Sequence, residues 1–175
     1  MSARATRHAV LGALVALVIA GGCGYRIAGY GGQLPGGITR VEVPVFENIT
    51  ARTDVGRVLT ENFINQLLGS AKVSVVAGEG AQALILGKVT GYKREPITFD
   101  SKEKPLANRL TLIMDVSLVS VGDKRLLFGE KAVTVRYDYP VKSDLQENDK
   151  LEDQAMRSAT KQMSQMLVSL MLESF

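Results

Sequence analysis

The chain has 175 residues, a formal net charge of +3 at pH 7, one histidine, one cysteine and no tryptophan. His8 and Cys23 both lie near the N-terminus, so the remaining chain lacks the commonest general base and metal ligand and has no thiolate nucleophile. It also lacks a glycine loop of the phosphate-binding type. The composition therefore argues against an enzyme and predicts neither a metal site nor a cofactor.

The first 22 residues have the pattern of a secretory signal. Arg4 and Arg7 precede an uncharged run over 9–20, which is too short to cross a bilayer that needs about 20 apolar residues. The run is followed by the sequence AGGC, which ends at Cys23 and resembles the bacterial lipobox. We therefore predict a lipoprotein signal peptide over 1–22 and a membrane anchor through Cys23, acylated as the mature N-terminus.

The residue after the cysteine and the remaining charge bear on location and partners. Gly24, and not aspartate, follows Cys23, which resembles lipoproteins of the outer membrane. We expect a lipid-anchored protein of the cell outer membrane that faces the periplasm. Loss of Arg4 and Arg7 reduces the 21 basic residues to 19, against 18 acidic ones, and this balance argues against a nucleic-acid partner.

The segment after the cysteine is rich in glycine. Residues 24–37, GYRIAGYGGQLPGG, contain six glycines and one proline. We assign 23–37 to the acylated cysteine and a tether, and 38–175 to a single α+β domain, whose size is enough for a core without disulfides.

Two strands and a helix are predicted in the first part of the domain. A strand over 38–46 alternates polar residues with Val41, Val43 and Val45, which we expect to point inward. A helix over 54–70 has apolar residues at three- and four-residue steps, and a short strand follows over 73–76.

Three longer strands and a final helix complete the domain. The strands are predicted over 83–92, 108–121 and 125–139, the last two as a hairpin. A helix over 149–172 carries the apolar stripe Leu151, Ala155, Ala159, Met163, Met166, Leu167 and Leu170. The order β-α-β-β-β-β-α predicts an α+β two-layer sandwich, with one mostly antiparallel sheet and two helices packed on one face.

A charged stretch separates the strand over 83–92 from the next one, and we interpret it as a loop. Basic side chains suit the phosphates of an anionic ligand, and they also suit a solvated loop diluted by Asp100 and Glu103. The basic residues of this stretch and of the start of the next strand are Lys93, Arg94, Lys102, Lys104 and Arg109.

Several stretches resemble the LptE family of lipopolysaccharide-assembly lipoproteins. They are Cys23-Gly24-Tyr25, Leu86-Gly87-Lys88-Val89, the strand Leu110–Leu118 and the closing helix, with VPVFENIT and GRVLTENFINQLL similar to a divergent branch. The resemblance implies a two-layer sandwich without catalytic residues. It also implies that the protein plugs the outer-membrane β-barrel LptD and helps to deliver lipopolysaccharide to the outer leaflet. The five basic residues named above are then the candidate contacts for lipopolysaccharide or the barrel.

Alternatives from other classes remain open at this stage. The stretch PVFENIT before an amphipathic helix also resembles activators of periplasmic cell-wall synthases and accessory lipoproteins of secretion channels. A flexible tether of about 14 residues has a typical reach of about 20 Å, which favours a partner in the membrane. An enzyme that uses carboxylates alone would need two acids converging in a pocket, and no local pair stands out.

Overall fold

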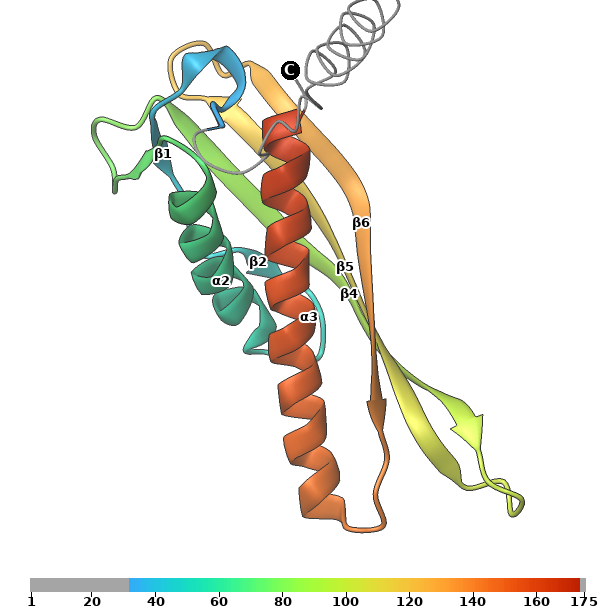
Figure 1. Cartoon of the computed structure of the whole chain (residues 1–175). Helices are drawn as coiled ribbons and strands as arrows, with labels where there is room; N and C mark the ends of the chain where they lie inside the picture. The colour runs from blue at the N-terminus through green and yellow to red at the C-terminus, as the bar shows by residue number, and fades with distance from the viewer. Residues whose placement is uncertain (1–31, 174–175) are drawn as a thin grey trace, which may run out of the picture.

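The computed structural model describes residues 32–173, in which two helices pack on one face of a six-stranded sheet (Figure 1). The predicted signal peptide, Cys23 and the tether up to residue 31 lie outside the described residues. Strand order is β3-β1-β4-β5-β6, and β2 also pairs with β4. The elements are η1 Pro35–Gly37, β1 Arg40–Glu42, β2 Glu47–Asn48, α2 Val55–Ser70, β3 Ser74–Val75, β4 Ala83–Phe99, β5 Pro105–Ser120, β6 Leu126–Pro140 and α3 Leu145–Glu173.

Short parallel pairs and long antiparallel pairs make up this sheet. β1 pairs in parallel with β3 and β4, and β2 pairs in parallel with β4. The three long strands β4, β5 and β6 are antiparallel and form most of the sheet. The predicted α+β sandwich with a mostly antiparallel sheet and two helices is confirmed.

Packing begins before the domain boundary that the sequence predicts. Leu34 and Pro35 fall within the glycine-rich 23–37 segment, yet both are buried, and Leu34 is part of the core. The Gly32 carbonyl accepts a hydrogen bond from the Lys72 backbone N–H at 3.2 Å. Residues 32–37 therefore contribute to the packed structure.

The strand predicted over 38–46 forms only β1, at Arg40–Glu42, and β2 follows just after the predicted end. This changes which side chains are buried. Pro44, which has no N–H to donate to a ladder, lies between the two strands. Val41 is fully buried as predicted, but the inward position predicted for Val45 is wrong, since it is 70% exposed. The chain changes register after β1, so Phe46 enters the core in its place.

Phe46 joins the helix layer to the sheet. Its ring lies 5.4 Å from the Phe63 ring of α2, and its backbone N–H donates to Thr60 Oγ1 at 2.9 Å. A Cβ at Gly87 of β4 would approach the Phe46 ring to 2.6 Å, and one at Gly56 of α2 would approach the Phe46 carbonyl oxygen to 2.6 Å. Phe46 thus occupies space that two glycines leave open.

The buried stripe of α3 differs from the predicted stripe. The prediction that Met166 faces the core is wrong, because this side chain is 37% exposed. The buried positions follow two rows with four-residue steps, and such rows turn by about 40° per step around a helix of 3.6 residues per turn. The rows are Ala155, Ala159, Met163, Leu167, Met171 and Met156, Thr160, Ser164, Val168.

Strand β4 continues well beyond Tyr92, where the sequence predicted its end, and β5 begins at Pro105, before the predicted start at residue 108. The prediction of a loop over residues 93–104 is wrong for 93–99, which continue β4. Lys93, Arg94 and Glu95 pair with Thr111, Leu110 and Arg109 of β5. Ladder pairing with the neighbouring strand, and not core burial, therefore holds these polar residues in a strand.

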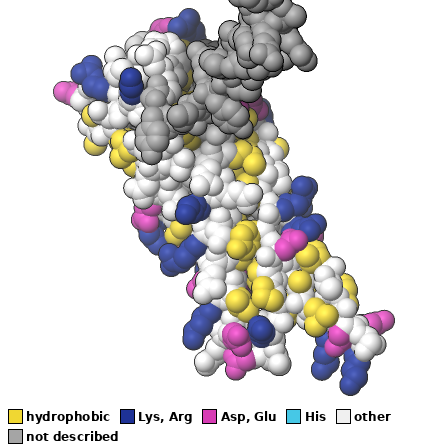
Figure 2. All heavy atoms as spheres, viewed as in Figure 1, with side chains coloured by type: hydrophobic (Ala, Val, Ile, Leu, Met, Phe, Trp, Pro, Cys, Tyr) yellow, Lys and Arg dark blue, Asp and Glu magenta, His cyan; other side chains and the backbone are white. Residues whose placement is uncertain are grey.

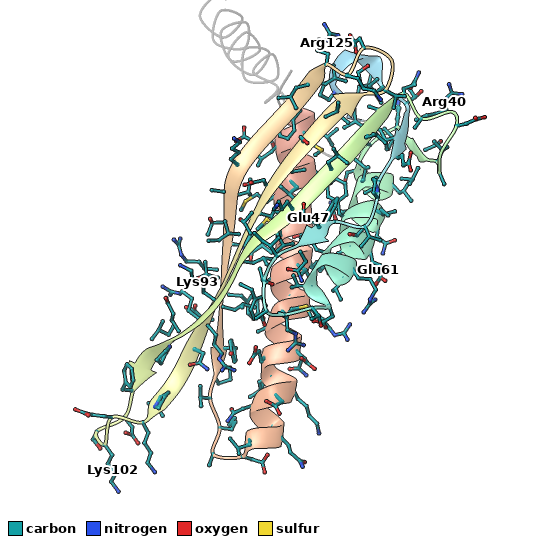
Figure 3. All side chains as sticks on the ribbon, turned by 180° about the vertical axis from the view of Figure 1, so that it is seen from behind. Arg40, Glu47, Glu61, Lys93, Lys102 and Arg125 are labelled. Carbon is teal, nitrogen blue, oxygen red and sulfur yellow. The ribbon has the colours of Figure 1, made fainter. Side chains whose placement is uncertain are left out.

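Helix α3 covers one face of the sheet, and the other face is uncovered in the described residues (Figure 3). On the helix side, apolar side chains gather most densely between α3 and the extended hairpin (Figure 2). Neither described helix is both long and apolar enough to cross a membrane.

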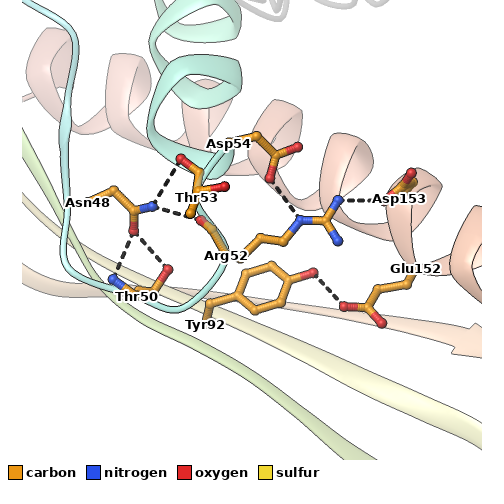
Figure 4. Close-up of polar contacts among 8 residues, drawn as sticks. All are labelled: Asn48, Thr50, Arg52, Thr53, Asp54, Tyr92, Glu152 and Asp153. Carbon is orange, nitrogen blue, oxygen red and sulfur yellow. Dashed lines mark hydrogen bonds and ion pairs between the residues drawn. The ribbon is translucent and has the colours of Figure 1, made fainter.

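A polar cluster ties the segment after β2 and strand β4 to α3 (Figure 4). Arg52 donates through Nε to Asp54 Oδ1 at 2.8 Å and through Nη2 to Asp153 of α3. The Tyr92 hydroxyl of β4 donates to Glu152 Oε1 at 3.2 Å, and burial together with this carboxylate raises the pKa of Tyr92. These contacts fix the base of the hairpin against the helix.

Substitution of Gly56 by alanine should destabilise the protein, because the new Cβ would lie 2.6 Å from the Phe46 carbonyl oxygen. Overpacking of this kind costs typically about 1–3 kcal/mol. Urea unfolding of the mature chain measures the change in the free energy of unfolding.

Gly69→Ala in the same helix is the matched control, because a Cβ there meets nothing within 4 Å. This change should stabilise the protein by about 0.5–1 kcal/mol, as alanine replaces glycine in a helix. Equal effects of the two substitutions would contradict the close approach at Gly56.

Acid should weaken the contact between Arg52 and Asp54. The Arg52 guanidinium donates a hydrogen bond to Asp54 and holds the pKa of that carboxyl below its usual range. A lowered folded-state pKa gives stabilisation that is complete above the unfolded value of about 3.9 and is lost as the pH falls through the folded value. The free energy of unfolding should fall below about pH 4, and Asp54→Asn should make this fall shallower.

The control is Asp149→Asn, at an exposed position of α3. Urea titrations between about pH 2 and 7 should give this variant the same acid dependence as the wild type. If Asp54→Asn also keeps the full wild-type dependence, the ion pair with Arg52 does not stabilise the fold.

Candidate functional site

The five basic residues singled out in the sequence lie along the extended hairpin of β4 and β5, but not in one cluster. Lys93 and Arg94 follow each other in β4, so their side chains leave opposite faces of the ladder. Lys102 and Lys104 lie in the turn at the tip, and Arg109 lies in β5. Figure 3 shows Lys102 at the far end of the hairpin and Lys93 nearer the body of the protein.

Both arginines of this set have carboxylate partners within the protein. Arg94 forms an ion pair through Nη1 with Glu152 of α3, and this carboxylate raises the pKa of Arg94. Arg109 donates through Nε and Nη2 to the two oxygens of Asp138 in β6, at 2.7 and 2.8 Å. The hydrogen bonds with Asp138 raise the pKa of Arg109. The two guanidinium groups therefore brace the hairpin against its neighbours.

The three lysines differ from the arginines. Among residues 32–173, no ion pair within 4.0 Å involves Lys93, Lys102 or Lys104. All three side chains are exposed. Their ammonium groups are the cations of the hairpin that are open to an external anion.

Asp100 orders the turn that carries two of these lysines. Its Oδ1 accepts the backbone N–H groups of Lys102 and Lys104 at 2.8 and 2.9 Å, and its own N–H donates to the Lys104 carbonyl at 2.9 Å. Glu103 completes the turn with a φ of 60°. The aspartate thus engages backbone groups and leaves the two ammonium groups unpaired.

Apolar side chains flank the lysines at the tip, and they were not among the candidate contacts predicted from the sequence. Phe99 is 52% exposed, and Ile97 and Leu106 are exposed as well. Exposed apolar residues beside cations form an amphipathic surface, which suits a ligand with both phosphate and acyl groups. The sequence ITFDSKEKPL has Ile97 and Phe99 before the charged turn DSKEK and Leu106 after it, and this pattern could have indicated the apolar residues at the tip.

The described residues offer little for metal chemistry. Within residues 32–173, no three His, Cys, Asp or Glu side chains lie close enough together to hold a metal ion. Cys23, the predicted lipidation site, lies outside this range.

The fold is shared with several bacterial proteins of known structure. A crystallised protein from Xanthomonas campestris matches with a TM-score of 0.54 and 13% identity over 77% of this chain and 85% of the other. Lipoprotein B from Nitrosomonas europaea gives 0.51 and 14%, over 83% and 91%. The PelC dodecamer from Paraburkholderia phytofirmans gives 0.50 and 14%, over 82% and 93%. At these identities the likeness establishes the fold alone.

The search of curated proteins found no match. The family model LptE, described as lipopolysaccharide-assembly, matches residues 38–171, which include every strand and both long helices except the last two described residues of α3. The match therefore covers nearly the whole described fold and confirms the resemblance seen in the sequence. The chain belongs to the LptE family, whose model is described as lipopolysaccharide-assembly.

Proposed function

We propose that this protein is an outer-membrane lipoprotein, anchored by acylated Cys23, that plugs an LptD-type barrel and helps it to assemble and to deliver lipopolysaccharide. The observation that carries the proposal is the LptE match over residues 38–171, because it spans the folded domain from β1 into the last turns of α3. The protein has no catalytic role in this proposal and acts through its surfaces.

The shape of the domain supports a plug. Residues 32–37 lie at the end of the molecule opposite the hairpin tip (Figure 1). Strand β4 alone has 17 residues, a length of about 55 Å, whereas the apolar band of a barrel is about 25 Å tall. An elongated domain held at one end can therefore extend along a barrel lumen with its tip far from the lipid anchor.

The distance from the anchor to the fold also supports a partner in the membrane. Only residues 24–31 lie between Cys23 and the first described residue, Gly32. Eight residues span at most about 29 Å even when fully extended. An activator of a cell-wall synthase would need a longer reach across the periplasm, and this short distance favours the barrel over that alternative.

Depletion of the protein should reduce the amount of correctly folded barrel. A partner that binds the folded barrel and not its unfolded chain stabilises the folded form by mass action. The measurements are the level of folded barrel in outer-membrane fractions and the sensitivity of the cells to large hydrophobic antibiotics. Expression of the wild-type protein from a plasmid should restore both.

A different outcome would select the alternative. If the level of folded barrel and the permeability stay unchanged while peptidoglycan synthesis falls, the protein is a synthase activator. Unchanged barrel with a loss of protein secretion would indicate a secretion-channel accessory.

The open lysines give a separate test of direct contact with lipopolysaccharide. A Lys102→Ala and Lys104→Ala double variant should bind purified lipopolysaccharide about tenfold more weakly, or about 1.4 kcal/mol, as two exposed charge contacts are lost. The difference should shrink at high salt, since screening reduces such contacts. Fluorescence titration at two salt concentrations measures both effects.

The matched control removes two exposed lysines outside the hairpin, Lys72 and Lys161. This variant has the same net charge as the tip variant and should bind like the wild type. Equal binding by both variants and the wild type would limit the role of the tip to contact with the barrel.

A further inference from the structure

A hollow of about 650 Å³ lies on the face of the sheet that no described helix covers. Its floor is one cross-strand row: Leu86 of β4 pairs with Ser117 of β5, which pairs with Gly129 of β6. Val45 borders the hollow from the segment before β2, and Leu126 borders it from β6, where its side chain lies 3.4 Å from the Cβ position of Gly129. Ser117 and Gly129 leave space in this row, and the larger apolar side chains Val45, Leu86 and Leu126 surround it.

The groove has an apolar part and a charged part. Val45 is 70% exposed, Leu126 61% and Leu86 44%, so three large apolar side chains border one hollow with no partner among the described residues. The next row along the strands is polar: Lys88 bonds Glu47 at 2.9 Å, and Asp115 accepts the Ala132 N–H at 2.9 Å. The charged residues of the lining are Glu47, Asp115 and Glu130 with Lys88 and Lys131.

The chemistry of the lining limits what can occupy the groove. Strand β5, in the middle of the floor, has hydrogen-bonded neighbours on both sides, so an incoming peptide strand cannot pair with it there. An acyl chain needs no hydrogen bonds and fits an apolar hollow. With three acids against two lysines, the rim offers no cationic site for a phosphate. A neutral acyl group therefore fits better than a phosphorylated lipid.

The chain itself supplies a candidate group a short way before the described structure. Cys23 lies nine residues before Gly32, and nine extended residues span at most about 30 Å. A group on so short a tether has a high effective concentration at the domain surface, well above that of a free lipid. The diacylglyceryl cysteine expected at this position carries no phosphate, in agreement with the rim.

We infer that the groove bordered by Val45, Leu86 and Leu126 holds one acyl chain of the protein's own lipid anchor when the protein is outside a bilayer. This inference rests on the acylation of Cys23 in the proposed function. The groove covers exposed apolar surface on both the anchor and the sheet in water, and a bilayer competes for the same chain. The anchor therefore leaves the groove when the protein reaches a membrane.

A fluorescent fatty acid methyl ester, which is neutral, tests whether the groove is an acyl site and whether the anchor fills it. The full mature chain with Cys23→Ser has no acyl group, so it should bind one dansyl-labelled fatty acid methyl ester. Ser117→Trp in this background fills the floor and should weaken binding at least tenfold. Thr111→Trp, on the same strand and face but outside the groove lining, should not. Thermal unfolding verifies that both tryptophan variants are folded.

The acylated wild-type protein, freed of detergent, should bind the probe at least tenfold more weakly than the Cys23→Ser chain. Phospholipid vesicles should draw the anchor out, which crosslinking detects. A photoreactive benzoylphenylalanine at Leu126 should crosslink to the N-terminal lipopeptide without vesicles and much less with them. The same residue at Thr111 should not crosslink to it.

Three results would overturn the inference. They are equal probe binding by the acylated and Cys23→Ser proteins, no binding by either, and a crosslink from position 126 to free lipid in place of the lipopeptide. Mass spectrometry of the N-terminal peptide keeps this test separate from the proposed function. An unmodified Cys23 would refute the anchor itself, whereas an acylated Cys23 without a crosslink would refute only the groove.

Discussion

Phe46 packs between α2 and β4, and the relative position of the helix layer and the sheet depends on this contact. The ring packs on Phe63 from the helix and over Gly87 of the sheet, while the Phe46 backbone runs against Gly56. Both glycines are needed for close approach, since a Cβ at either position would lie 2.6 Å from a Phe46 atom. The residue before Phe46, Val45, lies on the opposite face of the sheet and borders the groove there. The packing of Phe46 under α2 therefore also fixes one side of the groove.

Two different kinds of interaction stabilise the part of the sheet next to α2 and the part beyond Tyr92. Near α2, buried side chains such as Ile85, Val89 and Leu118 pack under the helices and make the sheet part of the core. Beyond Tyr92 the two strands continue mainly on backbone pairing, with Arg94 and Arg109 each fixed by a carboxylate on a neighbouring element. The hairpin is therefore a braced extension of the core, with exposed side chains on a stiff ladder. Such a part can present binding groups without taking part in the core.

Periodicity predicted the elements whose side chains are buried on one face. The alternation Leu110, Leu112, Met114, Val116 and Leu118 identified β5, and the apolar steps of residues 54–70 identified α2 within one residue. It did not predict the lower hairpin, because Lys93, Arg94 and Glu95 show no alternation of apolar and polar residues and their pairing with β5 is a property of the folded chain. The error at Val45 has a similar origin, since a change of register after Pro44 leaves no mark on the pattern.

The sequence predicted where the candidate site lies, but not which of its basic residues have partners within the protein. Composition identifies five cations, and only the structure separates Arg94 and Arg109, which have partners, from the lysines, which have none among the described residues. The apolar residues beside the tip were visible in the sequence but could not be weighed without their exposure. The groove was out of reach of sequence reasoning, because its floor consists of Leu86, Ser117 and Gly129, which meet only through strand register.

This division of roles between arginine and lysine agrees with the chemistry of the two side chains. A guanidinium presents a rigid fork that matches a carboxylate, as Arg109 does with both oxygens of Asp138, and so it suits a permanent internal brace. An ammonium on a flexible stem acts as a point charge that can follow a moving partner. In the proposed function the ligand passes the tip and is not retained there. A tip whose open charges are Lys102 and Lys104, beside Phe99 and Leu106, offers several weak contacts in place of one tight site, and weak contacts permit the ligand to leave.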